Sequence, residues 1–215
     1  MDNVIFENTP KIPMDAFLDT LSYEFTDAPY GVLENCLKRT VCRMCERTNV
    51  LRRVLYIHTQ ENVHNYLLEP PDCMDVIALM SVGYCQTKFL CSELIRMNRR
   101  DLRHGCCCHG NTVCVEGNEI IFSNPKNGDV YRVEISVKPG RDSCELDSIL
   151  LDEYEETVLM GVKAMMFEMS DKPWSSIQRA QLCEQSFLRE CAEVAVDVLN
   201  GGQRGAYKAK RQRAF

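Results

Sequence analysis

Apolar residues recur with the period of an α-helix in three segments of the chain, residues 27–49, 148–169 and 177–198. In the first segment the apolar positions lie three or four residues apart from Leu33 to Thr48, a spacing that places side chains on one helix face. Only a short interval separates the second and third segments, so we expect these two helices to be antiparallel neighbours. The three apolar faces need one shared core, which predicts a bundle of three long helices.

Capping and turn residues mark the ends of these segments. Asp27-Ala28-Pro29 is typical of a helix start, with a capping carboxylate and a proline in the first turn. Pro173 ends the second segment, and Ser175 or Ser176 is expected to cap the third helix. Asn200-Gly201-Gly202 is typical of a left-handed helix end.

Between residues 50 and 147 the pattern changes to short β-type runs separated by turn residues. Residues 131–137 alternate between apolar and polar side chains, as in a strand with one buried face. Gly117-Asn118 and Asn127-Gly128 predict tight turns. We also expect one short helix at residues 92–101. The remaining runs are rich in β-branched, aromatic and other apolar residues and lie at residues 54–58, 65–68, 76–80, 113–116 and 120–122.

Together the segments predict an α+β fold in which an antiparallel helical bundle carries an inserted, mostly antiparallel β region. Residues 1–26 are expected to form an N-terminal arm or a short helix. The bundle comprises residues 27–49 and 148–200, and the inserted β region comprises residues 50–147. Residues 201–215 are predicted to be an extended basic tail.

The composition is that of an ordinary globular protein. The chain has 215 residues, enough to bury a core, with 45% hydrophobic and 26% charged residues. No apolar run approaches the roughly 20 residues that span a bilayer, and the acidic, proline-containing N-terminal segment lacks the pattern of a signal peptide. We therefore expect no membrane contact and assembly in the cytoplasm.

Charge is unevenly distributed along the chain. The formal net charge is −6. The tail contains no acidic residue and has five basic ones, Arg204, Lys208, Lys210, Arg211 and Arg213. The remainder has 20 basic and 31 acidic residues, a net charge of about −11, which does not suit general nucleic-acid binding. The tail itself suits nucleic acid or an acidic partner surface. An acidic run at residues 142–156 offsets a helix dipole or offers a target for the tail of a neighbouring copy.

The cysteines suggest one possible metal site. There are 13, an odd number, and we expect them to be reduced thiols that serve as small apolar side chains. Zinc could instead be held by Cys106, Cys108, His109 and Cys114. The spacing is unfavourable, because three cysteines follow one another directly and no second ligand pair of the usual spacing follows. A zinc-stabilised regulatory or interaction module is therefore the alternative interpretation.

Few residues suggest enzyme chemistry. A cysteine nucleophile needs a base within hydrogen-bond reach and a group that orients this base. None of the four histidines, His58, His64, His104 and His109, lies in a recognisable nucleophile turn. No glycine turn leads into a helix start that would cradle a phosphate. We predict no enzymatic activity, no cofactor and no metal; a thiol enzyme would instead show one cysteine that reacts fast at neutral pH.

Short motifs follow one another between residues 27 and 200 in a specific order. They are Cys45-Glu46-Arg47-Thr48 at the end of the first helix, Pro70-Pro71-Asp72, Val115-Glu116-Gly117-Asn118-Glu119-Ile120, Phe122-Ser123-Asn124-Pro125, Val137-Lys138-Pro139, Ser143-x-Glu145-Leu146, Tyr154-Glu155-Glu156, Lys172-Pro173-Trp174-Ser175, Arg179-Ala180 and Phe187. This order resembles the head-to-tail adaptor proteins of tailed bacteriophages, also called neck or head-completion proteins. The run of cysteines at residues 106–108 departs from the pattern of that family.

The resemblance implies a non-enzymatic virion protein, located in the neck between portal and tail and assembled in the host cytoplasm. Such proteins form a homo-oligomeric ring, commonly of twelve copies, that extends the DNA channel without sequence-specific contacts to the passing genome. The ring also presents a platform to tail or nozzle proteins. In such proteins C-terminal extensions reach the portal protein, so the resemblance implies portal binding by Arg204, Tyr207, Lys208, Lys210, Arg211, Arg213 and Phe215.

Overall fold

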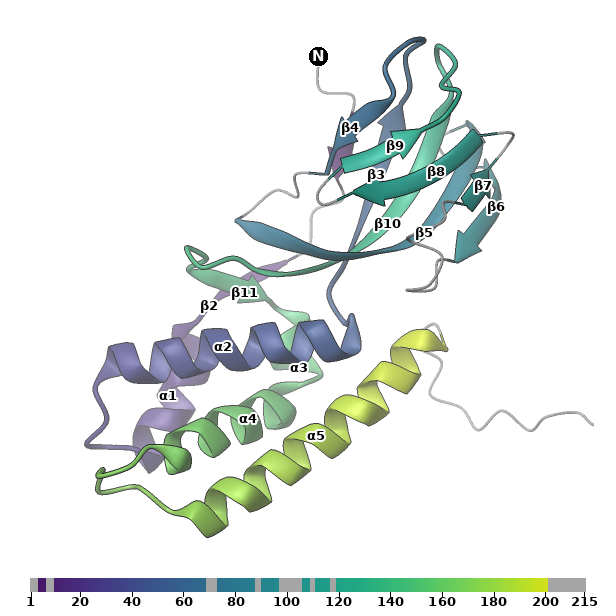
Figure 1. Ribbon diagram of the computed structural model, residues 1–215. Coiled ribbons are helices and arrows are strands. Elements are labelled where there is room, and N and C mark those ends of the chain that lie inside the picture. The colour runs from purple at the N-terminus through teal and green to yellow at the C-terminus, as the bar shows by residue number, and fades with distance from the viewer. Residues whose placement is uncertain are drawn as a thin grey trace, which may run out of the picture.

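The computed structural model describes residues 4–6, 10–68, 73–87, 90–96, 106–108, 111–116 and 119–200. The fold is α+β, with the helices at one end of the molecule and the large sheets at the other (Figure 1). The helices are α1 (Asp15–Glu24), α2 (Tyr30–Thr48), α3 (Ile149–Asp152), α4 (Glu155–Glu168) and α5 (Ile177–Leu199).

The predicted bundle of three long helices is wrong. The described ranges contain five helices, and α1, α3 and α4 have only 10, 4 and 14 residues. The segment predicted as one helix from residue 148 breaks at Glu153 and Tyr154. The break follows from tertiary contacts: Leu150 is fully buried, and the amide of Ser148 donates to the carbonyl oxygen of Pro10 at 3.1 Å. Apolar residues keep their helical period across the break, so the period alone does not reveal it.

The ends of the two longest helices differ in how they are capped. α2 begins at Tyr30 with Pro29 in the cap position and no side-chain cap, so the predicted capping by Asp27 is wrong. At the other end of α2, Asn49 adopts the left-handed conformation with φ of 53°. α5 begins after Ser176, whose hydroxyl oxygen accepts a hydrogen bond from the amide of Arg179 at 3.4 Å.

Helices α2, α4 and α5 meet at Gly161 of α4. A Cβ atom at this position would lie 2.4 Å from Cγ2 of Thr40 on α2 and 2.8 Å from Cδ2 of Phe187 on α5. A residue without a side chain is therefore required where the three helices meet.

Trp174, in the connection between α4 and α5, covers one end of this core, with its ring centre 6.5 Å from that of Phe25 in an edge-to-face arrangement.

Within the described ranges the strands form three antiparallel sheets. The five-stranded sheet has the order β1-β3-β10-β5-β6, and a four-stranded sheet has the order β4-β9-β8-β7. Strands β2 and β11 form a two-stranded ribbon beside the helices (Figure 1). The strands are β1 (Val4–Phe6), β2 (Lys11–Pro13), β3 (Arg52–His58), β4 (Asn65–Leu67), β5 (Met74–Thr87), β6 (Leu90–Arg96), β7 (Cys106–Cys108), β8 (Asn111–Glu116), β9 (Glu119–Phe122), β10 (Val130–Pro139) and β11 (Glu145–Asp147).

Aromatic side chains join the two larger sheets. Tyr131 of β10 and Phe122 of β9 are fully buried, and their ring centres are 4.6 Å apart. Tyr66 of β4 packs edge-to-face on Phe122 with 5.7 Å between ring centres. The alternation predicted for residues 131–137 thus places its apolar side chains in this core.

The short helix predicted at residues 92–101 is wrong over its described part. Residues 90–96 form β6, which pairs antiparallel with β5 at the edge of the five-stranded sheet. Pairing with the long neighbouring strand gives hydrogen-bond partners to the backbone groups that face β5, and this outweighs a weak local preference for helix. Residues 97–101 lie outside the described ranges.

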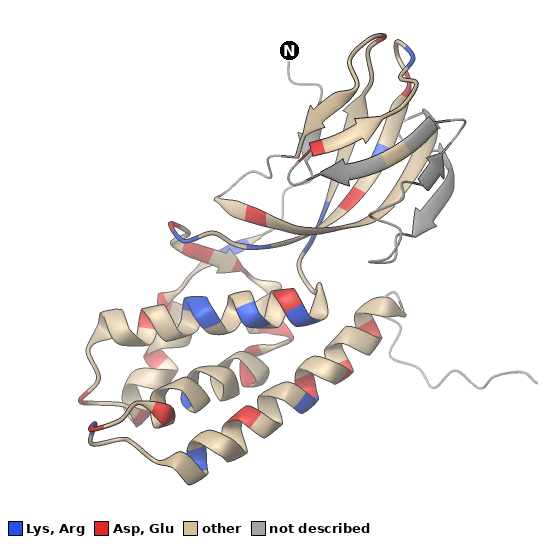
Figure 2. Cartoon of the chain, in the orientation of Figure 1, with Lys and Arg blue, Asp and Glu red and all other residues tan. Residues whose placement is uncertain are grey.

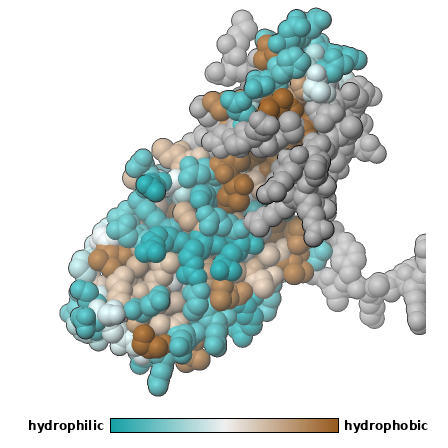
Figure 3. Space-filling view, in the orientation of Figure 1, coloured by the Kyte–Doolittle hydropathy of each residue, from teal (hydrophilic) through white to brown (hydrophobic). Residues whose placement is uncertain are grey.

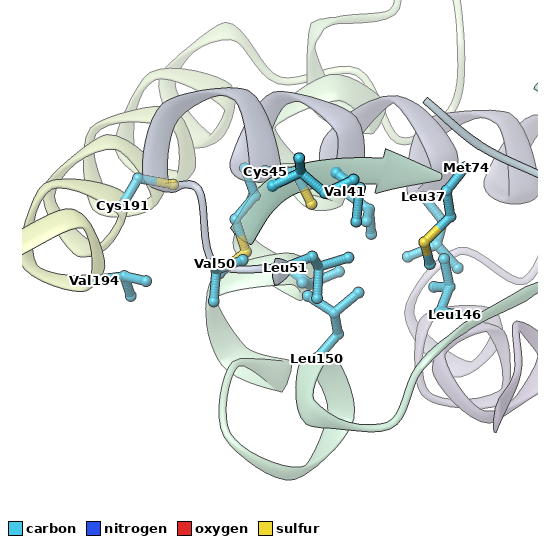
Figure 4. Close-up of a cluster of buried hydrophobic side chains, with 14 of the residues drawn as sticks. Leu37, Val41, Cys45, Val50, Leu51, Met74, Leu146, Leu150, Cys191 and Val194 are labelled. Atoms are coloured by element: carbon cyan, nitrogen blue, oxygen red, sulfur yellow. The ribbon is translucent and has the colours of Figure 1, made fainter. Parts of the chain in front are cut away.

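Part of the apolar core joins the helices to the β region (Figure 4). Leu37, Val41 and Cys45 of α2 point toward Leu51, at the start of the five-stranded sheet, and toward Leu146 of β11. All five are almost completely buried, and burial of each large aliphatic side chain contributes about 1.5–3 kcal/mol. The two ends of the molecule therefore share one continuous core.

Candidate interaction surfaces

The basic tail follows a helix whose end is held in place. Residues 201–215 lie outside the described ranges, and with them the seven predicted portal-binding residues Arg204, Tyr207, Lys208, Lys210, Arg211, Arg213 and Phe215. Arg52 of β3 donates from Nη2 to the carbonyl oxygen of Val198 in the last turn of α5, at 3.0 Å. The same guanidinium pairs through Nη1 with Glu134 of β10 at 2.9 Å. The tail thus starts from a point fixed against the five-stranded sheet.

The alternative zinc site falls on strands β7 and β8. Cys106 and Cys108 lie at the two ends of β7, paired in register with Val113 and Asn111 of β8, and Cys114 lies on β8. His109 lies outside the described ranges. An extended hairpin backbone is not the knuckle that structural zinc sites use. Among the residues that the structure describes, no group of three or more His, Cys, Asp or Glu side chains is arranged to hold a metal ion.

Most described thiols lie in apolar surroundings. Burial is the main cause of a raised thiol pKa at five positions, Cys36, Cys42, Cys45, Cys183 and Cys191. For Cys191 the pKa rises to about 11. Cys42, which is partly exposed, donates from its thiol to the carbonyl oxygen of Pro139 at 3.3 Å. A raised pKa disfavours the thiolate, so none of these five has the activation that a cysteine nucleophile needs.

Among the residues that the structure describes, Cys85 of β5 departs from the expectation of reduced thiols, because it is disulfide-bonded. The described free thiols are Cys36, Cys42, Cys45, Cys73, Cys144, Cys183 and Cys191. Position along the sequence does not distinguish Cys85 from these, because pairing depends on which strands become neighbours.

A groove of about 950 Å³ lies between α2 and α5, with α4 also lining it. Arg43 of α2 forms an ion pair with Glu184 of α5 here, and its guanidinium lies 5.1 Å from the centre of the Phe187 ring. The apolar lining of the groove consists of Cys36, Ala164, Met165, Met169, Ile177 and Ala180. The polar lining consists of Arg39, Arg43, Glu168, Gln181, Glu184 and Gln185.

Two smaller cavities lie at the outer ends of the molecule. One, of about 410 Å³, is beside Trp174 and Arg179 at the start of α5. The other, of about 370 Å³, is lined by the loops after β3 and β9, including His64 and Lys126. His64 contacts the carbonyl oxygen of Phe122 through Nδ1 at 2.9 Å. These lining residues do not combine a nucleophile with an oriented base, the arrangement that would suggest catalysis.

The outer face of α5 was missed by sequence reasoning, which named only the buried stripe of this helix. Leu182, Val196 and Leu199 are exposed by 66%, 55% and 65% on the side away from the core. Hydrophobic residues interrupt the hydrophilic surface of the helical part (Figure 3), and charged residues are spread along α2 and α5 (Figure 2). The signal in the sequence is a second series on α5 with apolar residues at Leu182, Ala192, Val196 and Leu199, which Gln185 and Arg189 interrupt.

No helix among the described residues is both long and apolar enough to cross a bilayer. No protein-family model matches the chain, and no curated protein matches it.

Proposed function

We propose that the chain is a head-to-tail adaptor of a tailed bacteriophage, a structural virion protein that joins the portal to the tail. Copies of the chain form a ring, of twelve by the pattern of the family it resembles, which extends the DNA channel. The ring presents its free surfaces to a tail or nozzle protein. The C-terminal tail binds the portal protein.

The observation that carries this proposal is the fixed exit of the basic tail. Arg52 holds the end of α5 through the carbonyl oxygen of Val198, and Glu134 holds Arg52 in turn. An extension that begins at a fixed point can contact only partners that lie within its own length of that point. Its five basic residues follow a body with a net charge of about −11, so the charge of the tail is opposite to that of the body and suits an acidic surface of another molecule.

The charge of the body supports a channel through which DNA passes. Phosphate groups repel carboxylates, so a wall with excess acidic residues does not hold the duplex. Such a wall lets the genome slide, whereas a basic lining would bind it at low salt.

The raised pKa values of the buried thiols support a structural protein over a thiol enzyme.

Removal of residues 203–215 tests the portal contact. The truncated chain is expected to keep the far-ultraviolet circular dichroism of the full chain and to bind portal rings of the same phage at least tenfold more weakly. A second variant replaces the basic residues of the tail by glutamine and is expected to lose binding as well. Lys126→Gln, in an exposed loop of the β region, is the control and should bind normally.

Affinity for portal rings is measured by sedimentation of the mixed complex, with native mass spectrometry to count copies. Unchanged affinity after truncation would show that the tail does not make the portal contact. Normal binding of the glutamine variant to portal rings would assign the contact to Tyr207 and Phe215 instead of to the basic residues.

A further inference from the structure

We propose that α5 joins neighbouring copies of this chain: the outer stripe near its C-terminal end lies in the groove between α2 and α5 of the next copy. The inference rests on the proposed function, because a ring requires a contact between neighbours, and it names the two surfaces that make this contact. It is carried by the shape, exposure and charge of the described helices.

α5 has apolar residues on two faces. Ala180, Phe187, Cys191 and Val194 are buried against α2 and α4. A second face carries residues at alternating intervals of three and four, the spacing of a helix seam that packs against another helix. These residues, the outer stripe, are all exposed: the apolar Leu182, Ala192, Val196 and Leu199 and the polar Gln185 and Arg189, of which Gln185 also lines the groove.

The exposure of the outer stripe is unusual for a helix at the edge of a protein. Leu182, Val196 and Leu199, its three large apolar residues, are each at least 55% exposed. A surface helix normally has polar residues opposite its buried face. A helix with two apolar faces is stabilised when its second face is also covered, and a neighbouring copy provides such a cover in a ring.

The groove between α2 and α5 has the properties of a receptor for a helix. It is large enough, at about 950 Å³, to take several side chains, and Ile177 within it is 64% exposed. Two methionines, Met165 and Met169, line it, and methionine side chains adapt to the shape of an incoming apolar surface. An apolar face of a helix in an apolar groove is a common mode of recognition between proteins.

Charges on the two surfaces are complementary. The outer stripe includes Arg189 and is flanked one turn later by the exposed Glu193. The groove has an exposed arginine, Arg39 of α2, and an exposed glutamate, Glu168 of α4. Within the described residues Arg39 and Glu168 form no ion pair with each other or with a third side chain. Glu193 of one copy beside Arg39 of the next is the pair that the proposal requires.

The two surfaces differ, so each copy donates its stripe to one neighbour and accepts the stripe of another. Such a contact leaves no stripe or groove uncovered when the series closes into a ring, or when two copies exchange their stripes reciprocally. The proposed adaptor function requires the ring.

Self-association of the full chain, followed by sedimentation equilibrium, tests the stripe. Wild-type chain is expected to associate as its concentration increases toward about 1 mM. Val196→Glu is expected to weaken association at least tenfold, whereas Val63→Glu, on an exposed loop of the β region, leaves it unchanged. A wild-type chain that stays monomeric at that concentration, or equal behaviour of the two variants, overturns the proposal.

A charge exchange tests the groove. Arg39→Glu and Glu193→Arg are each expected to weaken association, and the chain with both changes is expected to return to within about threefold of wild type. In addition, a photo-crosslinking amino acid at position 199 should capture peptides that contain residues 36–39 or 165–169 of another copy. Failure of the double variant to recover, or capture of a different surface, overturns the assignment to this groove.

Portal binding of the same variants separates the two proposals. If the chain binds portal rings but Val196→Glu associates like wild type, the adaptor function is supported and the α5 interface is refuted. If the chain associates through α5 but does not bind portal rings, the α5 interface is supported and the adaptor function is refuted.

Discussion

Arg53 and Asp147 form an ion pair inside the protein, with 2.5 Å between Nη2 and Oδ1 and 3% of each side chain exposed. Arg53 lies on β3 of the five-stranded sheet and Asp147 on β11 of the two-stranded ribbon. The guanidinium also contacts Sδ of Met74, at the start of β5, at 3.5 Å. The pair therefore connects the β region to the ribbon that leads into α3 and the other helices.

Removal of one partner of this pair should destabilise the whole protein. Asp147→Ala leaves the Arg53 charge in a desolvated site, and we expect a loss of about 3–5 kcal/mol in the free energy of unfolding, measured by urea denaturation. The joint change Arg53→Met with Asp147→Leu should recover most of that loss, since no charge is then buried. Lys138→Ala, which breaks the partly exposed pair with Glu46, is the control and should cost less than about 1 kcal/mol. Equal costs for the buried and the exposed pair would contradict this account.

Gly161 should not tolerate a side chain. Gly161→Ala places a methyl group 2.4 Å from Cγ2 of Thr40 and 2.8 Å from the Phe187 ring, so we expect overpacking to cost about 1–3 kcal/mol. Gly31→Ala, in the first turn of α2, has no heavy atom within 4 Å of the new methyl group. This control should be neutral or more stable, because alanine favours helix over glycine by up to about 1 kcal/mol. Thermal unfolding of the two variants gives the comparison, and a stable Gly161→Ala would refute the close packing at this position.

Cysteine alkylation should follow exposure. Cys73 and Cys144 are exposed, whereas Cys36, Cys45 and Cys191 are buried. At pH 7 and with a limiting amount of iodoacetamide, we expect Cys73 and Cys144 to be modified first and the buried three to react only after unfolding. Peptide mass spectrometry of the modified chain measures the order. Fast modification of Cys45 or Cys191 in the folded protein would instead support a thiol enzyme.

Stability should fall at high pH through Cys191. Burial raises the pKa of this thiol from 9.0 to about 11, so the folded state keeps its proton where the unfolded chain releases it. The stabilisation from this difference is complete below pH 9 and is lost as the pH rises from about 9 to about 11. Urea midpoints measured across that range should decline less steeply for Cys191→Ala than for wild type. The substitution also changes stability at neutral pH, but this constant difference does not affect the comparison of the two slopes. Identical slopes would exclude Cys191 as the source of the pH dependence.

Local signals predicted the parts of the fold that depend on local chemistry. Residues 33–48 lie in α2 and residues 177–198 in α5, because an apolar stripe and a cap act within one or two turns of helix. Ser176 was one of two predicted caps, and its hydroxyl accepts from the amide of Arg179. For the candidate site, the apolar residues on the second face of α5 could be read from the sequence, but the groove formed by three helices could not.

Apolar periods, turn residues and charge by themselves determined that this chain combines helices with antiparallel strands and follows an acidic body with a basic tail. Tertiary structure alone decided the break between α3 and α4, where burial of Leu150 and the hydrogen bond from Ser148 to Pro10 override a continuous helical period. It also decided that residues 90–96 pair with β5 as a strand and that Arg53 meets Asp147 across 94 positions of sequence. The physical reason is the same in each case. A period records which side of an element is apolar, whereas the partner that covers this side depends on segments distant in the chain.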